Sequence, residues 1–245
     1  MRKFGLLGKN IAYSFSKNYF SEKFNSENIT NTTYENFDIE NINKFVSILE
    51  NNPNINGLNV TIPYKESIIP YLDKLDKKAK KIGAVNTIKF TKKGKLKGYN
   101  TDFYGFKNAL KPYLKKQHKK ALLFGTGGAS KAIAYALKKL NIEYAFVSRK
   151  TSKNVQFTYK TLTPEDIKSH TILINCTPLG TSPNIEACPE IPYHAITEKH
   201  LLFDLIYNPT ETTFLKKGKQ NKAATSNGFK MLQLQAEKSW QIWNH

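Results

Sequence analysis

The sequence predicts an α/β protein of two domains, the first with mixed strands and the second with a parallel sheet. Short apolar runs alternate with helical patterns over about the first 100 residues of the chain. A glycine turn then joins a strand to a helix within 121–140, and another strand follows, the order that gives a parallel pair with a right-handed crossover. Two later apolar runs, 171–175 and 201–205, predict further buried parallel strands.

The period of the apolar residues predicts the elements of the first domain. Strands are expected at 4–8, 32–39 and 55–62, helices at 17–28, 41–51 and 72–82, and a hairpin at 84–91 and 95–100. The helix at 17–28 should turn Phe20 and Phe24 inward. The helix at 41–51 should turn inward Ile42, Phe45, Val46 and Leu49. Pro63 ends the third strand, because proline lacks the backbone donor that a central ladder requires.

The second domain should open with a helix at 102–114. We expect further strands at 121–124 and 144–147, and helices at 129–140 and 228–243. Thr163-Pro-Glu-Asp166 predicts another helix start, with proline at the first helical position and an acidic residue three positions after the cap.

Composition indicates a folded protein, with 40% hydrophobic residues. No window approaches the roughly 18 apolar residues of a membrane span, and the apolar run after Met1-Arg2-Lys3 is too short for an export signal. The two cysteines, Cys176 and Cys188, are too few for a disulfide framework or a zinc site, which fits a reducing cytoplasm. The five histidines show no metal-ligand spacing. We therefore expect a cytoplasmic protein without a metal or a membrane partner.

The formal net charge of +19 makes nucleic-acid binding the first function to weigh. The lysines are scattered over turns, the last turns of helices and solvent faces, without the interleaved aromatic residues that single-strand binding uses. We expect no specific nucleic-acid partner. A solvated basic surface that also attracts small anionic ligands is the preferred interpretation.

Lys65 is the most distinctive candidate for catalysis. It stands in Gly57-Leu-Asn59-Val-Thr61-Ile-Pro63-Tyr-Lys65-Glu66, where a buried strand is ended by proline and followed by the amine. An ammonium placed there can stabilise developing negative charge and donate a proton.

A second candidate site is the glycine turn Gly125-Thr126-Gly127-Gly128-Ala129-Ser130. Because it follows a strand and opens a helix, its backbone can approach a pyrophosphate whose charge meets the helix N-terminus. Ser130 stands where glycine or alanine is usual, a small change for helix-to-strand packing. A tight turn without a ligand is the alternative.

The end of the next strand indicates which nucleotide binds. An NAD-type site carries Asp or Glu about twenty residues beyond the glycines, where this chain has Ser148-Arg149-Lys150. A guanidinium there suits a 2′-phosphate, so NADP is favoured over NAD. An exposed basic turn is the alternative.

Asp102 follows Tyr99-Asn100-Thr101 at the predicted domain junction, where a cleft would lie. Taken alone, it is more simply explained as a helix cap. Together with Asn59, Thr61, Asn86 and Thr87, polar residues at or near strand ends, it predicts a hydroxyl-binding set.

These stretches belong to a series of motifs in a fixed order: Ile11-Ala-Tyr-Ser14-Phe-Ser16, Asn59 to Glu66, Gly83-Ala-Val-Asn86-Thr87, Asn100-Thr-Asp102, Gly125 to Ser130, Ser148-Arg149-Lys150, Asn175-Cys-Thr177-Pro-Leu-Gly180, Asp204-Leu-Ile-Tyr207, and Gly228-Phe-Lys-Met231-Leu-Gln-Leu-Gln235-Ala. In this order and spacing, the chain resembles the shikimate dehydrogenase family over nearly its whole length.

The resemblance implies an enzyme that interconverts 3-dehydroshikimate and shikimate with NADPH, on the route to aromatic amino acids. It also implies that the last helix returns to the first domain. Residues 1–101 plus 226–245 would then form the substrate-binding domain, and 102–225 the Rossmann-like NADP-binding domain.

The family's site residues carry over onto matching positions. The substrate carboxylate would be held by Ser14, Ser16 and Tyr207, and its hydroxyls by Asn59, Thr61, Asn86, Asp102 and Gln235. Lys65 and Asp102 would handle the proton. The cofactor would contact the glycine turn, the clamp Ser148, Arg149 and Lys150, and also Thr177, Leu205, Gly228 and Met231.

The chain departs from the family pattern at Tyr13 and Lys17, where histidine and proline are usual, at Ser148 in place of asparagine, and at Lys230 in place of glycine. None touches the presumed reacting pair. Lys230 should make positive φ harder to adopt, although its charge would favour phosphate.

The expected mechanism uses Lys65 as a charged proton donor. A neighbouring Asp102 favours the ammonium, so ketone reduction should be favoured and alcohol oxidation should improve as pH rises. The alternatives are a quinate or shikimate dehydrogenase paralogue, and a basic nucleic-acid-binding protein that kept the fold. A monomer and a homodimer both fit the sequence.

Overall fold

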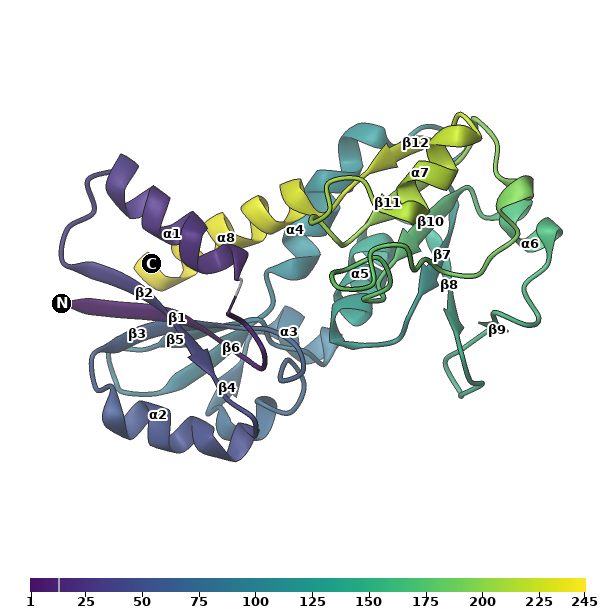
Figure 1. Ribbon diagram of the computed structural model, residues 1–245. Coiled ribbons are helices and arrows are strands. Elements are labelled where there is room, and N and C mark those ends of the chain that lie inside the picture. Colours follow the sequence, from purple (N-terminus) through teal and green to yellow (C-terminus); the bar gives the residue numbers. More distant parts are fainter. Residues whose placement is uncertain (13) are drawn as a thin grey trace. The chain divides into compact units, whose positions relative to one another are not determined.

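The chain forms two compact units. The computed structural model describes residues 1–12 and 14–245 (Figure 1). The first unit contains Met1–Thr101 and Ala236–His245, and the second contains Asp102–Gln235. The last helix, α8 (Phe229–Asn244), begins in the second unit and ends in the first, so the expected return of the C-terminal helix to the first domain is observed.

The first unit is built on a mixed sheet, as predicted. Its strands are β1 (Arg2–Gly8), β2 (Thr32–Asp38), β3 (Ile55–Val60), β4 (Lys74–Leu75), β5 (Thr87–Phe90) and β6 (Leu96–Tyr99), and its helices are α1 (Phe15–Ser26), α2 (Phe45–Asn51) and α3 (Lys77–Ile82), with 3-10 turns η1 (Ile42–Lys44) and η2 (Ile69–Tyr71). The strand order is β2-β1-β3-β5-β6-β4. β1 lies parallel to β2 and β3, whereas β5 pairs antiparallel with β3 and β6.

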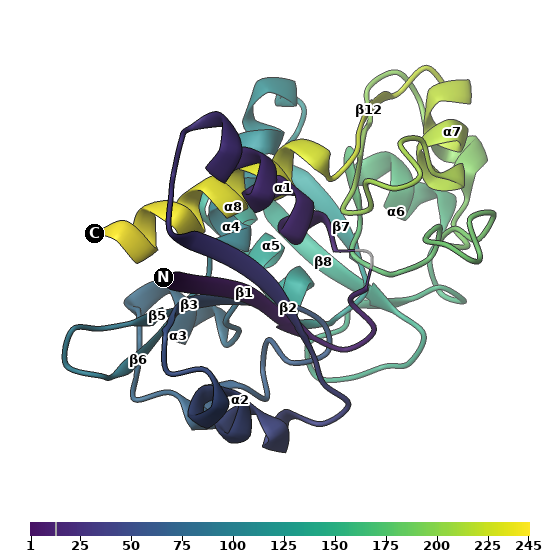
Figure 2. The same ribbon diagram turned by 60° about the vertical axis from the view of Figure 1, so that its left-hand side comes forward.

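Helices cover both faces of this sheet. α1 and the end of α8 lie over one face and α2 over the other (Figures 1 and 2). Phe20 and Phe24 of α1 are buried there beside Trp243 of α8, which confirms the predicted apolar face. Trp243 is fixed by a hydrogen bond from its indole N–H to the Ile88 carbonyl (2.9 Å). Gly57 of β3 lies directly under the indole, which occupies the space that a Cβ would need.

Two predictions in the first unit were wrong. Val46 is 48% exposed, because Ile42, Phe45 and Leu49 form the inward stripe and Val46 lies about 100° further round the helix. The helix predicted at 72–82 is shorter. Residues 74–75 form β4 instead, beside β6.

Local capping sets the true start of that helix. The Asp76 carboxylate accepts from the Lys78 amide (2.9 Å), so α3 begins at Lys77. It ends at Gly83, whose left-handed conformation (φ 74°) closes the last turn.

The second unit is a doubly wound parallel sheet. Its strands are β7 (Lys120–Phe124), β8 (Glu143–Ser148), β9 (Phe157–Thr158), β10 (Ile172–Asn175), β11 (Leu201–Asp204) and β12 (Ala224–Ser226), and its helices before α8 are α4 (Asp102–Leu110), α5 (Gly128–Lys139), α6 (Pro164–Ser169) and α7 (Thr213–Gln220), with 3-10 turns η3 (Lys111–Tyr113) and η4 (Tyr193–Ala195). Every strand pair is parallel, in the order β12-β11-β10-β7-β8-β9.

This order confirms the predicted Rossmann-like domain. If the strands β7 to β12 are numbered 1 to 6, their order across the sheet, starting from β9, is 3-2-1-4-5-6. This is the strand order of dinucleotide-binding domains. The direction of the crossovers reverses between β7 and β10, and ligands bind at the carboxyl ends of strands at such a switch point. The loops after β7 and β10 are therefore the expected cofactor loops.

Helix ends in the second unit follow the sequence closely. Thr163 and Asp166 form the predicted capping box, with the Asp166 amide donating to the Thr163 hydroxyl (3.2 Å) and the Thr163 amide to the Asp166 carboxylate (2.9 Å). α4 ends at Leu110 rather than 114, and a 3-10 turn containing Pro112 follows.

Several short elements were not predicted, namely β4, β9, β12 and α7. β8 and β9 are parallel, yet residues 149–156 join them without a helix in the described chain. Parallel pairs usually need a longer, helical crossover. Among the described residues, the structure has no helix long and apolar enough to cross a membrane.

Replacing Trp243 with Phe should weaken the docking of the last helix. The substitution removes a buried hydrogen bond to the Ile88 carbonyl, which costs about 1–3 kcal/mol. Urea unfolding measures the loss, and Trp240→Phe in the same cluster, where the indole is only half-buried, is the matched control. Equal losses in the two variants would contradict the importance of this hydrogen bond.

Candidate active site

Lys65 lies in the turn after β3, and its backbone is held on both sides. The Thr61 amide donates to a carbonyl of β1 (2.9 Å), and the Lys65 carbonyl accepts from the Val85 amide (2.7 Å). Between them, the buried Tyr64 donates its hydroxyl to the Ile39 carbonyl (2.6 Å). The backbone beneath the amine is therefore rigid, while the Lys65 residue itself is half-buried.

The two serines predicted to bind a carboxylate stand at the start of α1. Ser14 is the N-cap, and its hydroxyl accepts from the Ser16 amide (3.1 Å). The loop before them is fixed by Asp38, whose carboxylate accepts from the amides of Asn10 (2.9 Å) and Ile11 (3.0 Å). Hydroxyl groups at a helix N-terminus suit an anionic ligand.

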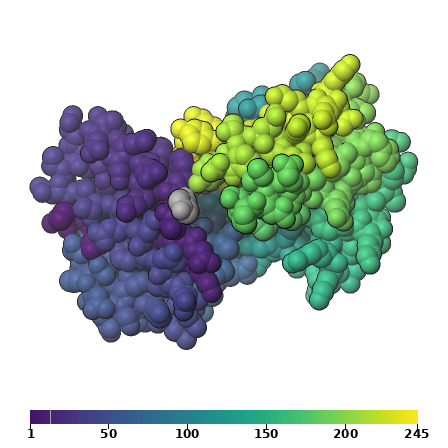
Figure 3. Space-filling model, in the orientation of Figure 1, coloured from purple at the N-terminus to yellow at the C-terminus, as the bar shows by residue number. Residues whose placement is uncertain are grey.

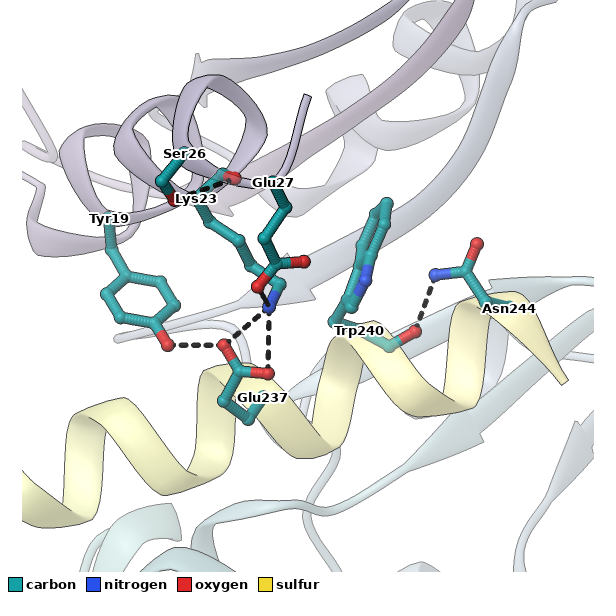
Figure 4. A network of polar contacts seen from close by, with 7 residues as sticks. All are labelled: Tyr19, Lys23, Ser26, Glu27, Glu237, Trp240 and Asn244. Carbon is teal, nitrogen blue, oxygen red and sulfur yellow. Dashed lines mark hydrogen bonds and ion pairs between the residues drawn. The ribbon is translucent and has the colours of Figure 1, made fainter. Parts of the chain in front are cut away.

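A polar cluster ties α1 to the part of α8 that belongs to the first unit (Figure 4). The Tyr19 hydroxyl donates to Glu237 (2.5 Å), and the Lys23 ammonium pairs with both Glu27 (2.6 Å) and Glu237 (2.9 Å). Burial alone would lower the pKa of Lys23, but hydrogen bonds to the two carboxylates raise it above its ordinary value. The helix that presents the serines is thus held by a charged Lys23.

Asn86 is fixed by its neighbours in the first unit. Its side-chain oxygen accepts from the Thr101 amide (2.6 Å) and the Thr87 hydroxyl (3.1 Å), and its NH2 group donates to the Thr101 hydroxyl (2.9 Å). All three residues are buried. Because a backbone N–H can only donate, the orientation of the Asn86 amide is determined.

Asn59 lies in the same buried network. Its side-chain oxygen accepts from the Tyr34 hydroxyl (2.8 Å), and its NH2 group donates to the Ser239 hydroxyl (3.0 Å) and the Asn86 carbonyl (3.2 Å). Ser239, on α8, also lies 2.8 Å from the Thr87 hydroxyl oxygen. Burial raises the pKa of Tyr34, while a hydrogen bond from Ser16 lowers it, so Tyr34 stays a neutral donor.

The predicted contact of Asn59 with a substrate hydroxyl stays a prediction. The structure adds a supporting role, since the Asn59 amide, 4% exposed, has partners inside the unit. Sequence reasoning missed Tyr34 and Ser239. The signal for Ser239 was its position four residues after Gln235, which places both on one face of the last helix.

The glycine turn of the second unit, Gly125–Ser130, follows β7 as predicted. Gly125 has φ 103°, and a Cβ there would lie 3.1 Å from the Thr177 side chain in the loop after β10. Gly127 is the N-cap of α5 without a side-chain cap, and open space surrounds its missing Cβ. The Ser130 hydroxyl donates to the Gly127 carbonyl (2.7 Å). A helix N-terminus without a side-chain cap, beside open space, fits a pyrophosphate.

The end of β8 carries cationic side chains. Ser148 is the last strand residue and pairs with Thr158 of β9, while Arg149 and Lys150 are exposed. Tyr159 lies near this turn. Burial raises the pKa of Tyr159 to about 12, and the nearby positive charge of Arg149 partly opposes this rise. Exposed cations at this strand end fit a 2′-phosphate and not the hydroxyl of an NAD ribose.

Of the other predicted cofactor residues, Thr177, Leu205 and Gly228 lie on three loops and Met231 lies in the first turn of α8. The Leu205 amide donates to the Asn175 carbonyl (3.1 Å), which joins the loops after β10 and β11. Gly228 lies against Leu205 so closely that a Cβ would collide with the Leu205 carbonyl, and the Gly228 amide donates to the Ile206 carbonyl (2.9 Å). Glycine is therefore required at position 228, because any side chain would collide with Leu205.

Asp102 and Gln235 lie on two helices that cross closely within the second unit. Asp102 is the first residue of α4, and Gly105 follows one turn later. A Cβ at Gly105 would meet the Met231 carbonyl and the Gln235 side chain of α8. Asp102 and Gln235 are both buried, and Gln235 donates to the Leu232 carbonyl (3.0 Å). The glycine allows these helices to pack closely.

The predicted site residues therefore fall into two groups, one in each unit. The first unit carries Ser14, Ser16, Asn59, Thr61, Lys65 and Asn86. The second carries Asp102, the glycine turn, Ser148, Arg149, Lys150, Thr177, Leu205, Tyr207, Gly228, Met231 and Gln235. Lys65 and Asp102 belong to different units, so their pairing stays a prediction.

Comparison with known proteins covers both groups. A family model described as the shikimate dehydrogenase substrate binding domain matches residues 6–88. A relative from Methanosphaera stadtmanae, named shikimate dehydrogenase (NADP(+)), is 38% identical over 98% of this chain and 90% of its own length. The chain belongs to the shikimate dehydrogenase family.

Solved structures of shikimate dehydrogenases share the fold. That of shikimate dehydrogenase 1 from Peptoclostridium difficile has a TM-score of 0.86 and 39% identity, and covers 100% of this chain and 92% of its own. The enzyme from Thermus thermophilus, in complex with NADP(H) and shikimate, has a TM-score of 0.87 and 28% identity, and covers 99% of this chain and 93% of its own.

Of the departures from the family pattern within the described residues, Lys17 and Lys230 lie on the surface. Lys17 is exposed in α1, and Tyr13 lies outside the described residues. Lys230 is exposed in the first turn of α8, so its backbone is helical and does not use a positive φ. Ser148 keeps its place in the strand. Within residues 1–12 and 14–245, no group of three or more metal-ligating side chains gathers.

Gly105→Ala should destabilise the second unit. Alanine normally stabilises a helix by about 0.5–1 kcal/mol relative to glycine, but here the added methyl group meets the Met231 carbonyl and overpacking costs about 1–3 kcal/mol. Thermal unfolding measures the balance, with Lys107→Ala on the same helix as control. A variant more stable than the native protein would show that the helices do not pack as closely as described.

Proposed function

We propose that this protein is a shikimate dehydrogenase that catalyses the reversible, NADPH-dependent reduction of 3-dehydroshikimate to shikimate. The observation that carries the proposal is the match to a relative named shikimate dehydrogenase (NADP(+)) over 98% of this chain. That length includes the serine loop, Lys65, the glycine turn and the last helix. The reaction is an oxidation or reduction at a CH–OH group on the route through chorismate to aromatic amino acids.

NADPH supplies the hydride when it is bound. The pyrophosphate would lie at the uncapped N-terminus of α5, on the amides of the glycine turn. Arg149 and Lys150 would hold the 2′-phosphate, with Ser148 beside them. Thr177, Leu205, Gly228 and Met231 would line the rest of the cofactor. The contacts of Gly125 with Thr177 and of Gly228 with Leu205 support this assignment.

The substrate would be held by polar groups from both units. Ser14, Ser16 and Tyr207 would bind the carboxylate, and Asn59, Thr61, Asn86, Asp102 and Gln235 would bind the hydroxyls. Asn59 also supports Asn86 by donating to its carbonyl. Lys65 would donate a proton to the forming alkoxide, with Asp102 as its proposed partner in handling the proton.

The proposal includes a cytoplasmic protein that acts on a small molecule. Its support is the free state of both cysteines, Cys176 and Cys188, and the scattered lysines. We propose no specific nucleic-acid or membrane partner, no metal, and a monomer or homodimer in solution.

One assay tests the function. Purified protein is mixed with shikimate and NADP, and the absorbance of NADPH is followed. Rapid NADPH formation is expected, with much slower reaction when quinate replaces shikimate or NAD replaces NADP. A protein that oxidises quinate faster than shikimate would be a quinate dehydrogenase instead.

Lys65→Met should lower turnover sharply. Loss of a positioned proton donor costs about 10²–10⁴-fold in kcat, while KM for shikimate should change little. Lys95→Met, on the exposed hairpin, is the control for removing one lysine charge. Near-normal kcat in Lys65→Met would rule out its role in proton transfer.

Arg149→Asp should reverse the cofactor preference. The carboxylate repels the 2′-phosphate, and loss of charged hydrogen bonds of about 1.5–3 kcal/mol raises KM for NADPH about 10- to 100-fold. KM for NADH should change much less. Lys153→Asp, exposed in the same loop, controls for net charge, and an unchanged NADPH-to-NADH ratio in Arg149→Asp would remove the clamp from the proposal.

A further inference from the structure

Asp204, the last residue of β11, is a buried carboxylate to which the reaction assigns no role. It is 0% exposed and accepts hydrogen bonds from three uncharged donors. These are the side chain of Asn175 (3.0 Å), the backbone amide of Ile206 (3.0 Å) and the hydroxyl of Thr212 (2.6 Å). A buried charge without a cation is costly, so its presence requires an explanation.

The first of these bonds holds Asn175 in one orientation together with its bonds to Thr177 and Leu179. An ionised carboxylate only accepts, so the NH2 group of Asn175 must face Asp204 and its oxygen must face the other way. That oxygen accepts from the amide (3.0 Å) and the hydroxyl (2.6 Å) of Thr177. The Asn175 NH2 group also donates to the Leu179 carbonyl (3.2 Å). The Thr177 amide can only donate, so it favours the same orientation, and Asp204 holds the Asn175 side chain that shapes the loop after β10.

The second bond shapes the loop after β11. The same oxygen of Asp204 that binds Asn175 also accepts from the Ile206 amide, which closes a tight turn around Leu205. Tyr207 follows directly. Leu205 and Tyr207 are the residues proposed to contact cofactor and substrate, so one carboxylate shapes both loops.

The other carboxylate oxygen holds the start of α7. Thr212 is the N-cap of this helix, is fully buried, and donates to Asp204. A Cβ at Gly180, at the end of the loop after β10, would lie 3.4 Å from Thr212. The green segment after β10 and the yellow-green segment around α7 lie side by side in the space-filling view (Figure 3).

We infer that Asp204 is a positioning residue: its carboxylate binds the Asn175 side chain and the Ile206 amide, and so holds both cofactor loops in their binding shape. The inference rests on the proposed function.

The negative charge on Asp204 lowers the stability of the folded protein, although it holds the two loops. Burial raises the pKa of Asp204 to about 6, and the hydrogen bonds from Thr212, Ile206 and Asn175 only partly oppose the rise. The ionisable groups that face it, the Cys176 thiol and the Tyr193 phenol, are themselves kept neutral because burial raises the pKa of each. The folded protein thus binds this proton more tightly than the unfolded chain. The stability that the protonated Asp204 contributes is present at low pH and is lost as pH rises through about 6.

Asp204→Asn removes the charge and keeps the shape of the side chain. If the asparagine oxygen keeps the bonds from Asn175 and Ile206, its NH2 group faces Thr212, so the bond that the Thr212 hydroxyl donates is lost and the remaining bonds go to a weaker, uncharged acceptor. At pH 7.5 we expect the Kd for NADPH, measured by fluorescence titration, to rise about 10-fold, the equivalent of about 1.4 kcal/mol. Hydrogen exchange at the amides of Thr177 and Ile206 should become faster. The melting temperature should stay equal or rise, because a buried charge is removed. Asp166→Asn, in the exposed capping box, is the matched control.

Acid pH gives a second readout. Between pH 7.5 and 5, NADPH binding by the native protein should weaken more than binding by Asp204→Asn, since only the native protein loses the Asp204 charge. Titration of the 2′-phosphate, near pH 6, affects both proteins alike. Parallel pH profiles in the two proteins would overturn the inference.

The outcomes distinguish this inference from the proposed function. If the native protein fails to oxidise shikimate with NADP, the proposed function fails and the inference with it. If it is active but Asp204→Asn keeps native NADPH affinity and native exchange at Thr177, the inference alone is wrong.

If Asp204→Asn does not fold, a comparison of Thr212→Val with Thr212→Ser tests the inference instead. Faster exchange and weaker NADPH binding in Thr212→Val, rescued by serine, support the inference, and native values overturn it.

Discussion

Buried polar side chains at strand ends must find hydrogen-bond partners inside the protein, and both groups of site residues depend on this constraint. In the first unit, the amide of Asn86 faces the Thr101 backbone N–H, which can only donate. In the second, the amide of Asn175 faces the Asp204 carboxylate, which can only accept. Each asparagine is therefore held in one orientation by a neighbour of fixed polarity, and the loops beside it take one shape.

The last helix packs closely against a glycine in each unit. Gly57 lies under Trp243, near the end of α8, and Gly105 lies against Met231, near its start. Gly228, just before the helix, lies against Leu205. A methyl group would collide with the Trp243 indole at Gly57 and with backbone atoms at Gly105 and Gly228. Packing density, as much as hydrogen bonding, therefore sets the geometry of the proposed site.

Prediction succeeded where the determining signal was local. The turn from β7 to α5 and the capping box at Thr163 each depend on a few adjacent residues, and both were predicted correctly. It failed where pairing with a distant strand outweighed propensity. Lys74–Leu75 became a strand because β6 lies beside it, although its surroundings have a helical period. Two-residue β9 was missed because so short a strand has no measurable period.

The sequence alone determined the types of chemical group available: an amine after a broken strand at Lys65, a glycine turn before α5, and cations at Arg149 and Lys150 in place of an acid. Only the tertiary structure decided which polar residues act together. Ser239 meets Asn59 across 180 residues of sequence, and Asp204 meets Asn175 across 29. The reason is physical, because a buried polar atom must pair with whatever folding brings within about 3 Å, and sequence spacing carries no record of that distance.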